Sequence, residues 1–298
     1  MMQRVLWAAI LGLTLTSTGC ASRQSTWEAK PEDAATAPAG ESKDALIAQG
    51  DESWKKRDER ASLETAIGAW ENAVKLQPND AATLTKLSHA YYFLADAHLR
   101  KGGAKSEEYL STFEKGVAIG ERALAAANPK FKELMVAGGK VEDGIKEVGQ
   151  EGVEPMYWYA ASLGKWARAK GFATTLGNKE RIKSVMGRVL ELDPNFFHGA
   201  ADRYFGAFYA VAPGFAGGSM EKSKEHFEKS LALAPNYAGT KVLMADVYAV
   251  KKQDRALFDK LLDEVLSMPA DALPGLEPET KIEKEKAAEL KTEAADKF

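Results

Sequence analysis

The stretch AIGAWENAVKLQPND, residues 66–80, decides the fold class. It combines small residues, an aromatic residue and a proline at a fixed spacing: Ala66, Trp70, Ala73 and Pro78. Small residues let two helices approach closely, the large side chain fills the gap between them, and proline ends a helix because it has no amide hydrogen. This spacing is the signature of the second helix of a tetratricopeptide-type helical hairpin.

The same ending recurs along the chain. Closely matching copies end at Pro194 and Pro235, and a looser copy ends at Pro129. The proline intervals are 51, 65 and 41 residues (78 to 129, 129 to 194 and 194 to 235), whereas regular repeats of this kind keep about 34. The sequence therefore predicts an all-α fold, a degenerate tetratricopeptide-like array of helical hairpins (an α-solenoid) over residues 44–276.

The last segment, residues 277–298, has a different composition. It carries charges of both signs, and its large aliphatic residues are Ile282 and Leu290. A repeat array needs a terminal element with one apolar side and one polar outer side. We predict a C-terminal capping helix here, with its charged residues forming a solvated face.

The composition narrows the function classes. The 298 residues are 45% hydrophobic, and 40 Lys+Arg against 43 Asp+Glu give a formal net charge of −3. A chain without a basic field is not expected to bind nucleic acid. The four histidines lack the spacing of a metal pair, and the glycine-rich segments lack the flanks of a P-loop or a nucleophile elbow. We therefore predict no enzyme activity, no catalytic residue, no metal and no cofactor.

The first twenty residues resemble a secretion signal. Arg4 precedes an apolar stretch, residues 5–16, that is too short to cross a bilayer. Small residues then lead to Cys20, the single cysteine of the sequence, as in a bacterial lipobox, although Ser17 stands where that pattern favours leucine. We expect a lipoprotein signal peptide over residues 1–19 and acylation of Cys20. The alternative is an ordinary signal peptide with an incidental cysteine.

The residues from Cys20 onward favour a membrane location. Two or three acyl chains suffice for stable anchoring, since each buried methylene contributes ~0.8 kcal/mol. Ala21 in place of aspartate favours sorting to the outer membrane, so the protein is expected at the periplasmic face of the bacterial envelope. Residues 20–43, rich in Ala, Pro, Ser, Thr and Glu, are predicted to form a lipidated flexible tether.

Aromatic residues cluster in two predicted helices. Adjacent aromatic side chains cannot all lie on one apolar stripe, so they meet apolar surroundings on several sides or line a cavity. Counting from the inner leucines Leu87 and Leu163 places candidate ligand-binding residues in the groove of the array: His89, Tyr92, Phe93, Trp158, Lys165 and Arg168. The helix after Pro194 contributes either Phe205 and Phe208 or Gly206 and Tyr209, depending on its register. The aromatic residues would bind an apolar body, and Lys165 or Arg168 would meet a carboxylate. The alternative is that these aromatic side chains are core between repeats.

Two longer segments point to a family. PMYWYAASLGKW (residues 155–166) and GGSMEKSKEHFEKSL (residues 217–231) occur together with an FxxLL ending at residues 258–262, the lipobox and the degenerate array. This combination resembles the T-component (TatT-type) family of TPR-associated TRAP (tripartite ATP-independent periplasmic) transporters, over roughly residues 44–290. A departure is Ser223, where the repeat pattern prefers alanine.

The resemblance implies a non-enzymatic, lipid-anchored periplasmic accessory protein. Such a protein associates with the periplasmic solute-binding protein of a TRAP transporter and shelters an apolar organic-acid ligand between its helices. A scaffold lipoprotein that organises a cell-envelope complex is the alternative, and the partners recovered by pull-down would distinguish the two. Repeat arrays with exposed apolar ends often self-associate, so a homo-oligomer also stays open.

Overall fold

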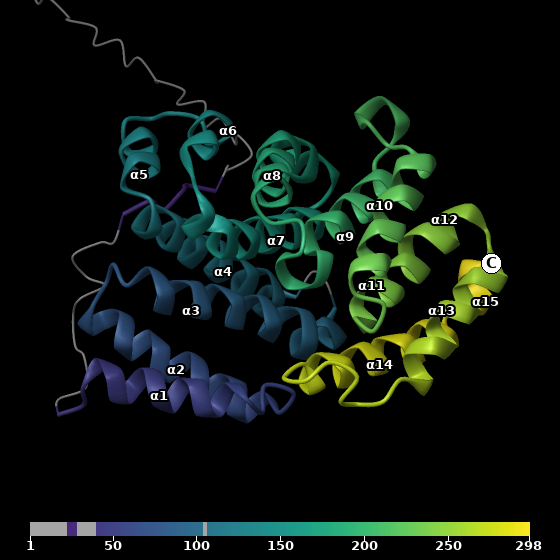
Figure 1. The fold of residues 1–298 in the computed structure, drawn as a ribbon, viewed down its shortest axis with the longest axis horizontal. Coiled ribbons are helices and arrows are strands. Elements are labelled where there is room, and N and C mark those ends of the chain that lie inside the picture. The colour runs from purple at the N-terminus through teal and green to yellow at the C-terminus, as the bar shows by residue number, and fades with distance from the viewer. Residues whose placement is uncertain (1–22, 29–39, 104–105) are drawn as a thin grey trace, which may run out of the picture.

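The computed structural model describes residues 23–28, 40–103 and 106–298 (Figure 1). Within these residues every regular element is helical, which confirms the predicted all-α class. No helix among them is both long and apolar enough to span a bilayer. The signal peptide and Cys20 lie outside the described residues.

The α-helices run in chain order as α1 (Lys43–Trp54), α2 (Arg60–Leu76), α3 (Ala81–Phe93), α4 (Glu107–Ala127), α5 (Pro129–Val136), α6 (Val141–Gly144), α7 (Val153–Lys170), α8 (Phe172–Leu192), α9 (Phe196–Val211), α10 (Met220–Leu233), α11 (Ala238–Leu243), α12 (Val250–Lys252), α13 (Arg255–Ser267), α14 (Glu277–Thr292) and α15 (Ala294–Lys297). Two π-helical segments continue first helices of the array: η2 (Leu94–Leu99) follows α3, and η7 (Met244–Ala249) follows α11.

Consecutive helices pack as hairpins, α1 with α2, α3 with α4, α7 with α8 and α9 with α10 (Figure 1). The helices α2, α4, α8 and α10 each end two residues before a proline of the repeat pattern. This position agrees with the physical role of proline, which cannot donate the next helical hydrogen bond. The short helices α5 and α6 are inserted between α4 and α7, and this insertion accounts for the longest proline interval.

Small residues allow the close helix packing that the sequence pattern implies. Ala66 and Trp70 of α2 are buried in the same core. A Cβ atom on Gly206 of α9 would lie 2.7 Å from the ring of Phe227 in α10, so a larger residue would push the helices apart. The hydroxyl of Ser223 donates to the carbonyl oxygen of Gly206 at 2.7 Å. Serine therefore replaces the expected alanine without leaving an unsatisfied buried polar group.

Residues 23–28, which the sequence assigns to the tether, pack on the body. Arg23 forms an ion pair with the fully buried Glu121 of α4, and the backbone amide of Thr26 donates to the same carboxylate at 2.7 Å. The indole of Trp27 lies edge-on to the rings of Phe131 in α5 and Tyr159 in α7, at centroid distances of 5.4 and 5.9 Å. These residues therefore belong to the folded body and not to a flexible tether.

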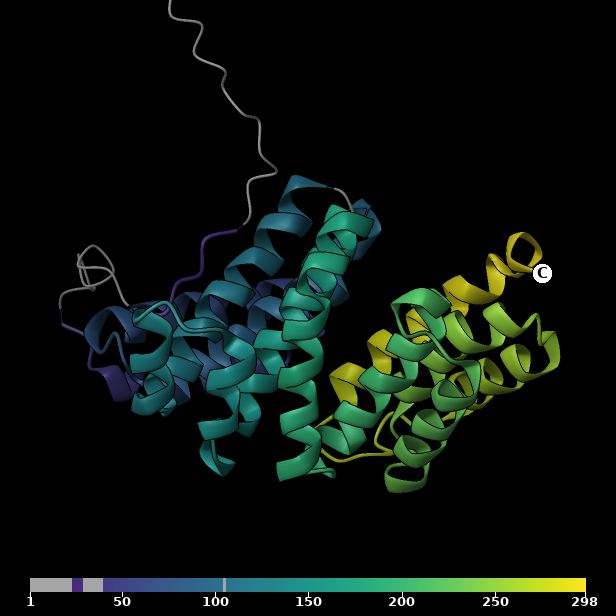
Figure 2. The same ribbon diagram turned by 90° about the horizontal axis from the view of Figure 1, so that it is seen from above.

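Helix α14 begins beside the loop after α1, where Lys281 pairs with Asp58, and runs alongside α13 to α15 at the C-terminus (Figure 1). Seen from above, α1–α8 and α10–α13 form two groups of helices, with α14 against the second (Figure 2). Each group has its own hydrophobic core. Ile282 of α14 belongs to the first core and Ala287 to the second, so α14 joins the two.

Charged residues of α14 tie it to the first group of helices. Glu279 pairs with Arg57, which follows α1, with Nε and Oε1 2.7 Å apart and side chains that are 9% and 5% exposed. About two turns further along α14, Nζ of Lys286 lies 2.6 Å from Oδ2 of Asp96 in η2. The expectation that these charges form a solvated face is wrong for Glu279, Glu283 and Lys286, whose contacts close the array. Lys281 and Glu293, by contrast, are exposed as expected.

Asp96 connects three elements. Its carboxylate accepts from Lys286 of α14 and, at 2.5 Å through Oδ1, from Lys165 of α7. Burial alone would raise the pKa of Asp96, but the two ammonium groups outweigh burial and hold the pKa well below its ordinary range. Asp96 is therefore ionised at any pH at which the protein is expected to work, and it holds η2, α7 and α14 together.

We predict that Asp96→Asn lowers the free energy of unfolding by about 2–3 kcal/mol, because it leaves two ammonium groups facing each other. Removing one partner of a fully buried ion pair costs ~3–5 kcal/mol. The effect is smaller here because the side chain of Lys165 is 38% exposed. The contribution of a carboxylate with a lowered pKa is complete above its ordinary pKa of ~3.9 and is lost as the pH falls through the lowered value. Urea unfolding should therefore give the same deficit at pH 8 and pH 5, and a smaller one below about pH 4.

The exposed Asp271, between α13 and α14, provides the control, and Asp271→Asn should change the free energy of unfolding by less than about 0.5 kcal/mol. Equal effects of the two substitutions at pH 7 would contradict the structural role of Asp96.

Candidate ligand-binding site

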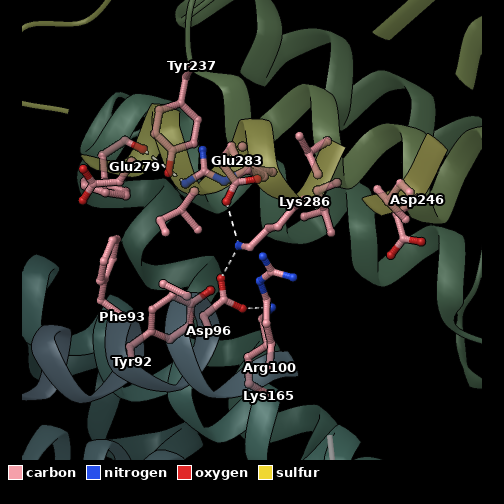
Figure 3. A pocket seen from close by; sticks show the side chains of 18 of the residues that line it. Tyr92, Phe93, Asp96, Arg100, Lys165, Tyr237, Asp246, Glu279, Glu283 and Lys286 are labelled. Atoms are coloured by element: carbon pink, nitrogen blue, oxygen red, sulfur yellow. Dashed lines mark hydrogen bonds and ion pairs between the residues drawn. The ribbon is translucent and has the colours of Figure 1, made fainter. Parts of the chain in front are cut away.

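A cavity of about 350 Å³ lies between the first group of helices and the C-terminal helices. Its lower wall in Figure 3 comes from α3, η2 and α7 and includes Tyr92, Asp96 and Lys165, while Tyr237 and Lys286 face them from the other side. The cavity thus lies where α14 meets the hairpin array. Residues of both sides form two chemically different parts of the lining, an aromatic wall and an ionic wall.

One wall is aromatic. The ring of His89 stacks on the indole of Trp158 with centroids 3.5 Å apart and planes 12° apart. Phe197 lies edge-on to Trp158 at 5.1 Å, and Tyr237 lies 5.7 Å from Phe197. Burial, together with a nearby arginine, lowers the pKa of His89 well below its usual value, so its ring stays neutral and serves as one more aromatic surface.

A strained bend places Phe197 in this wall. Phe197, His198 and Gly199, at the start of α9, have φ angles of 40°, 60° and 69°, in the left-handed region that costs a residue other than glycine of order 1–3 kcal/mol. Arg203, one turn further on, donates to the carbonyl oxygen of His198 at 3.1 Å and to that of Phe197 at 3.4 Å. These hydrogen bonds stabilise the bend, because the carbonyl groups at a distorted helix start need hydrogen-bond donors from outside the regular helix.

The other wall is ionic. Asp96 lies between Lys165 and Lys286, and Lys286 also pairs with Glu283 at 2.7 Å (Figure 3). Arg100, at the edge of this wall, pairs with Glu289. Each of these charges is balanced by a neighbour, so the wall is polar but has little excess charge.

The two π-helical segments both contribute to the cavity. Asp96 comes from η2 and Asp246 from η7, and both follow an alanine in the sequence. A π-helical turn widens the helix and re-aims the side chains in it, which is why such segments recur at functional sites. Asp246 pairs with Lys297 of α15 at 3.3 Å, as Asp96 pairs with Lys286 of α14.

The structure brings together part of the predicted site. Tyr92, Trp158 and Lys165 line the cavity, as do His89 and Phe93, which were predicted to face the groove. Arg168 is exposed on α7 and does not line the cavity. The prediction is also wrong in position for Phe205, which is buried against His226 of α10, and for Phe208, which is half-buried away from the cavity.

Neither predicted register of α9 places its middle in the cavity. Gly206 packs against Phe227, and Tyr209 stacks near His226 at 5.5 Å. The bend at the start of α9 turns the helix, so that Phe197 and Arg203 face the cavity instead.

Several cavity residues escaped the sequence reasoning, namely Asp96, Tyr157, Phe197, Arg203, Tyr237, Glu283 and Lys286. A signal existed for two of them. Asp96 lies in the apolar run Phe93-Leu94-Ala95-Asp96-Ala97, and Arg203 follows Asp202 in another run of apolar residues. Charged residues among apolar helix positions are rarely buried without a partner or a role.

The geometry suits binding. Among the described residues, no group of three His, Cys, Asp or Glu side chains could hold a metal ion. The aromatic wall offers an apolar molecule rings on several sides, and the ionic wall closes the space behind it. The cavity volume falls within the range of about 300–1,000 Å³ that small-molecule sites have.

Comparisons with known proteins agree with the resemblance noted in the sequence. A protein of Treponema pallidum (strain Nichols), described as an uncharacterized protein, is 23% identical over 191 residues, which cover 62% of this chain and 58% of that protein. The family model of the TRAP transporter T-component matches residues 96–298, more than half of the chain. That family comprises transporter accessory proteins and not enzymes. The chain therefore belongs to the TRAP transporter T-component family.

Proposed function

We propose that this protein is a non-enzymatic, lipid-anchored accessory component of a TRAP-type transporter, located at the periplasmic face of the bacterial outer membrane. In this role it partners a periplasmic solute-binding protein and holds an apolar organic acid in its cavity. The observation that carries the proposal is the aromatic-walled cavity in a chain of the T-component family.

The cavity supports holding a ligand and not transforming it. The stacked pair of His89 and Trp158, with Phe197 edge-on, offers polarisable apolar surface to a small organic molecule. The lowered pKa of His89 makes its ring a weak base, and the ring is stacked on Trp158, so His89 is poorly suited to act as a general base. The ionic wall is internally paired, so its charges stabilise the fold and not a reaction.

We predict that filling the cavity weakens ligand binding. Leu243 of α11 lines the cavity and is half-buried, so Leu243→Trp places an indole in the space that a ligand would occupy. With octanoate as the probe, isothermal titration calorimetry should show binding at least tenfold weaker than in the wild type. The matched control is Leu266→Trp on α13, at a residue that is 36% exposed and outside the cavity. Equal binding by both variants would contradict a ligand in this cavity.

The docked N-terminal segment supports attachment of the body close to the membrane. Arg23 is held on Glu121, and two residues separate it from Cys20. At ~3.3–3.6 Å per extended residue, an acylated Cys20 would lie within about 10 Å of the folded body. We therefore place the surface around Arg23 and α4 next to the bilayer, and the lipid anchor becomes a short link.

We predict that Cys20→Ser moves the protein from the membrane fraction to the soluble fraction when the full chain is expressed in a Gram-negative host. The reason is that the acyl chains on Cys20 hold the protein at the membrane. The described residues contain no helix that could span the bilayer in their place. Ser17→Leu, which restores the usual lipobox residue, should leave the protein in the membrane fraction. Retention of the Cys20→Ser protein on carbonate-washed membranes would contradict the anchor.

Exposed apolar side chains support a protein partner. Phe172 and Leu176 lie one turn apart at the start of α8, and Phe215 is 83% exposed in the loop after α9. Lys179, one turn beyond Leu176, donates to the carbonyl oxygen of Ala216 at 3.4 Å, which brings this loop against the same face of α8. A cluster of this kind on a folded surface is typical of a protein contact.

We predict that Phe215→Asp reduces recovery of the partner at least tenfold in affinity purification from the native envelope, because it places a charge in the apolar contact. The expected partner in the wild-type eluate, identified by mass spectrometry, is a periplasmic solute-binding protein. Val136→Asp, at an exposed apolar residue of α5, is the control and should leave recovery unchanged. Recovery of cell-wall or assembly proteins without a solute-binding protein would instead favour an envelope scaffold.

A further inference from the structure

We propose that Arg203 is the anion-binding residue of the cavity and that the ligand is a monocarboxylate with an apolar body. The carboxylate lies against the guanidinium of Arg203, and the body lies against the aromatic wall. This inference rests on the proposed function and names the chemical class of its ligand.

Arg203 is a buried cation whose neighbours are neutral. It is 5% exposed and lines the cavity. Its guanidinium donates to backbone carbonyl groups and, at 3.4 Å, to the hydroxyl of Tyr157, and it lies 4.4 Å from the ring centroid of Tyr237. With Thr240, whose hydroxyl lies 3.5 Å from Nη1, these partners accept from the two terminal nitrogens, leave the N–H of Nε without an acceptor among the described residues, and do not neutralise the charge. Burying an unpaired charge costs several kcal/mol, so such a group next to a cavity calls for an anion.

The other charges of the cavity are already paired. Ten charged side chains line it, and nine of them have a partner of opposite charge. The pairs are Asp96 with Lys165 and Lys286, Glu283 with Lys286, Glu279 with Arg57, Glu289 with Arg100, and Asp246 and Glu293 with Lys297. Among the residues that the structure describes, Arg203 is the charged cavity residue that has no ion-pair partner.

Neither of the two cations that the sequence suggested for a carboxylate suits this role. Lys165 is bound to Asp96, so a ligand carboxylate beside it would lie against a second anion. Arg168 is exposed and outside the cavity. Arg203 has neither disadvantage, because the carbonyl groups that hold it fix its position without competing as counter-ions.

The surroundings of Arg203 suit one carboxylate. Burial raises the pKa of Tyr237 far above its usual value despite the nearby Arg203, so its hydroxyl stays protonated and can donate to an anion. Figure 3 shows Tyr237 pointing into the cavity. A second carboxylate on the ligand would approach Asp96 and Glu283, whose cations are already engaged. The cavity therefore favours a monocarboxylate over a dicarboxylate.

The test compares four probes of equal chain length on the full chain carrying Cys20→Ser, by isothermal titration calorimetry. These are octanoate, the neutral 1-octanol, the cationic octylammonium and the dicarboxylate suberate. We expect octanoate to bind at least tenfold more tightly than each of the others, since a hydrogen bond to a charged group contributes ~1.5–3 kcal/mol and 1.4 kcal/mol is tenfold in affinity.

Variants assign this preference to one residue. Arg203→Met should weaken octanoate binding at least tenfold and change 1-octanol binding less than threefold, whereas Arg203→Lys should retain most of the preference for the anion. Lys165→Met is the matched control and should keep that preference, because its charge is already used by Asp96. If Arg203→Met does not fold, because the bend at residues 197–199 is released, the wild-type ranking of the four probes decides the question.

The outcomes separate the two proposals. Binding of 1-octanol with no preference for octanoate, or equal octanoate binding by Arg203→Met, overturns the role of Arg203 and leaves the cavity as a ligand site. Binding of none of the probes to the wild type overturns the ligand-holding function, and the inference with it.

Discussion

The contact of Lys286 and Lys165 with one carboxylate, that of Asp96, is the interaction on which the rest of the structure depends. It joins α14, α7 and η2, so a chain of hairpins that would otherwise continue as an open array closes on itself. The buried pair of Glu279 and Arg57 fixes the start of α14 in the same way. Because the array is closed, its groove becomes a cavity with two defined walls. Under the proposed function, this cavity holds a small molecule away from water.

The closed cavity has an uneven distribution of charge and strain. Its ionic wall is neutralised by contacts that also hold the fold, while its aromatic wall contains one buried cation, Arg203, with neutral partners. The same residue supports the left-handed bend that turns Phe197 into the cavity. Backbone strain and an unpaired charge thus occur together at the start of α9. Strained residues and perturbed charges cluster at functional sites, where their free-energy cost is part of the function.

Local sequence patterns predicted the hairpins because the contacts within a hairpin are local. The small–aromatic–small–proline spacing describes one helix and its neighbour, and the cavity positions of Tyr92, Trp158 and Lys165 follow from the register of two such first helices. The closure could not be predicted in this way, since Asp96 and Lys286 are 190 residues apart and their pairing leaves no periodic pattern. The error at Phe205 and Phe208 has a local cause, because three left-handed residues rotate α9 away from the register that its sequence suggests.

The most direct test of the central claim is a crystal structure of the protein with octanoate. The account predicts one octanoate in the cavity, with its carboxylate within hydrogen-bond distance of the guanidinium of Arg203, its chain along Trp158 and Phe197, and the contact between Asp96 and Lys286 intact. A structure in which octanoate binds outside the cavity, or in which α14 has left Asp96 while the ligand is bound, would contradict it.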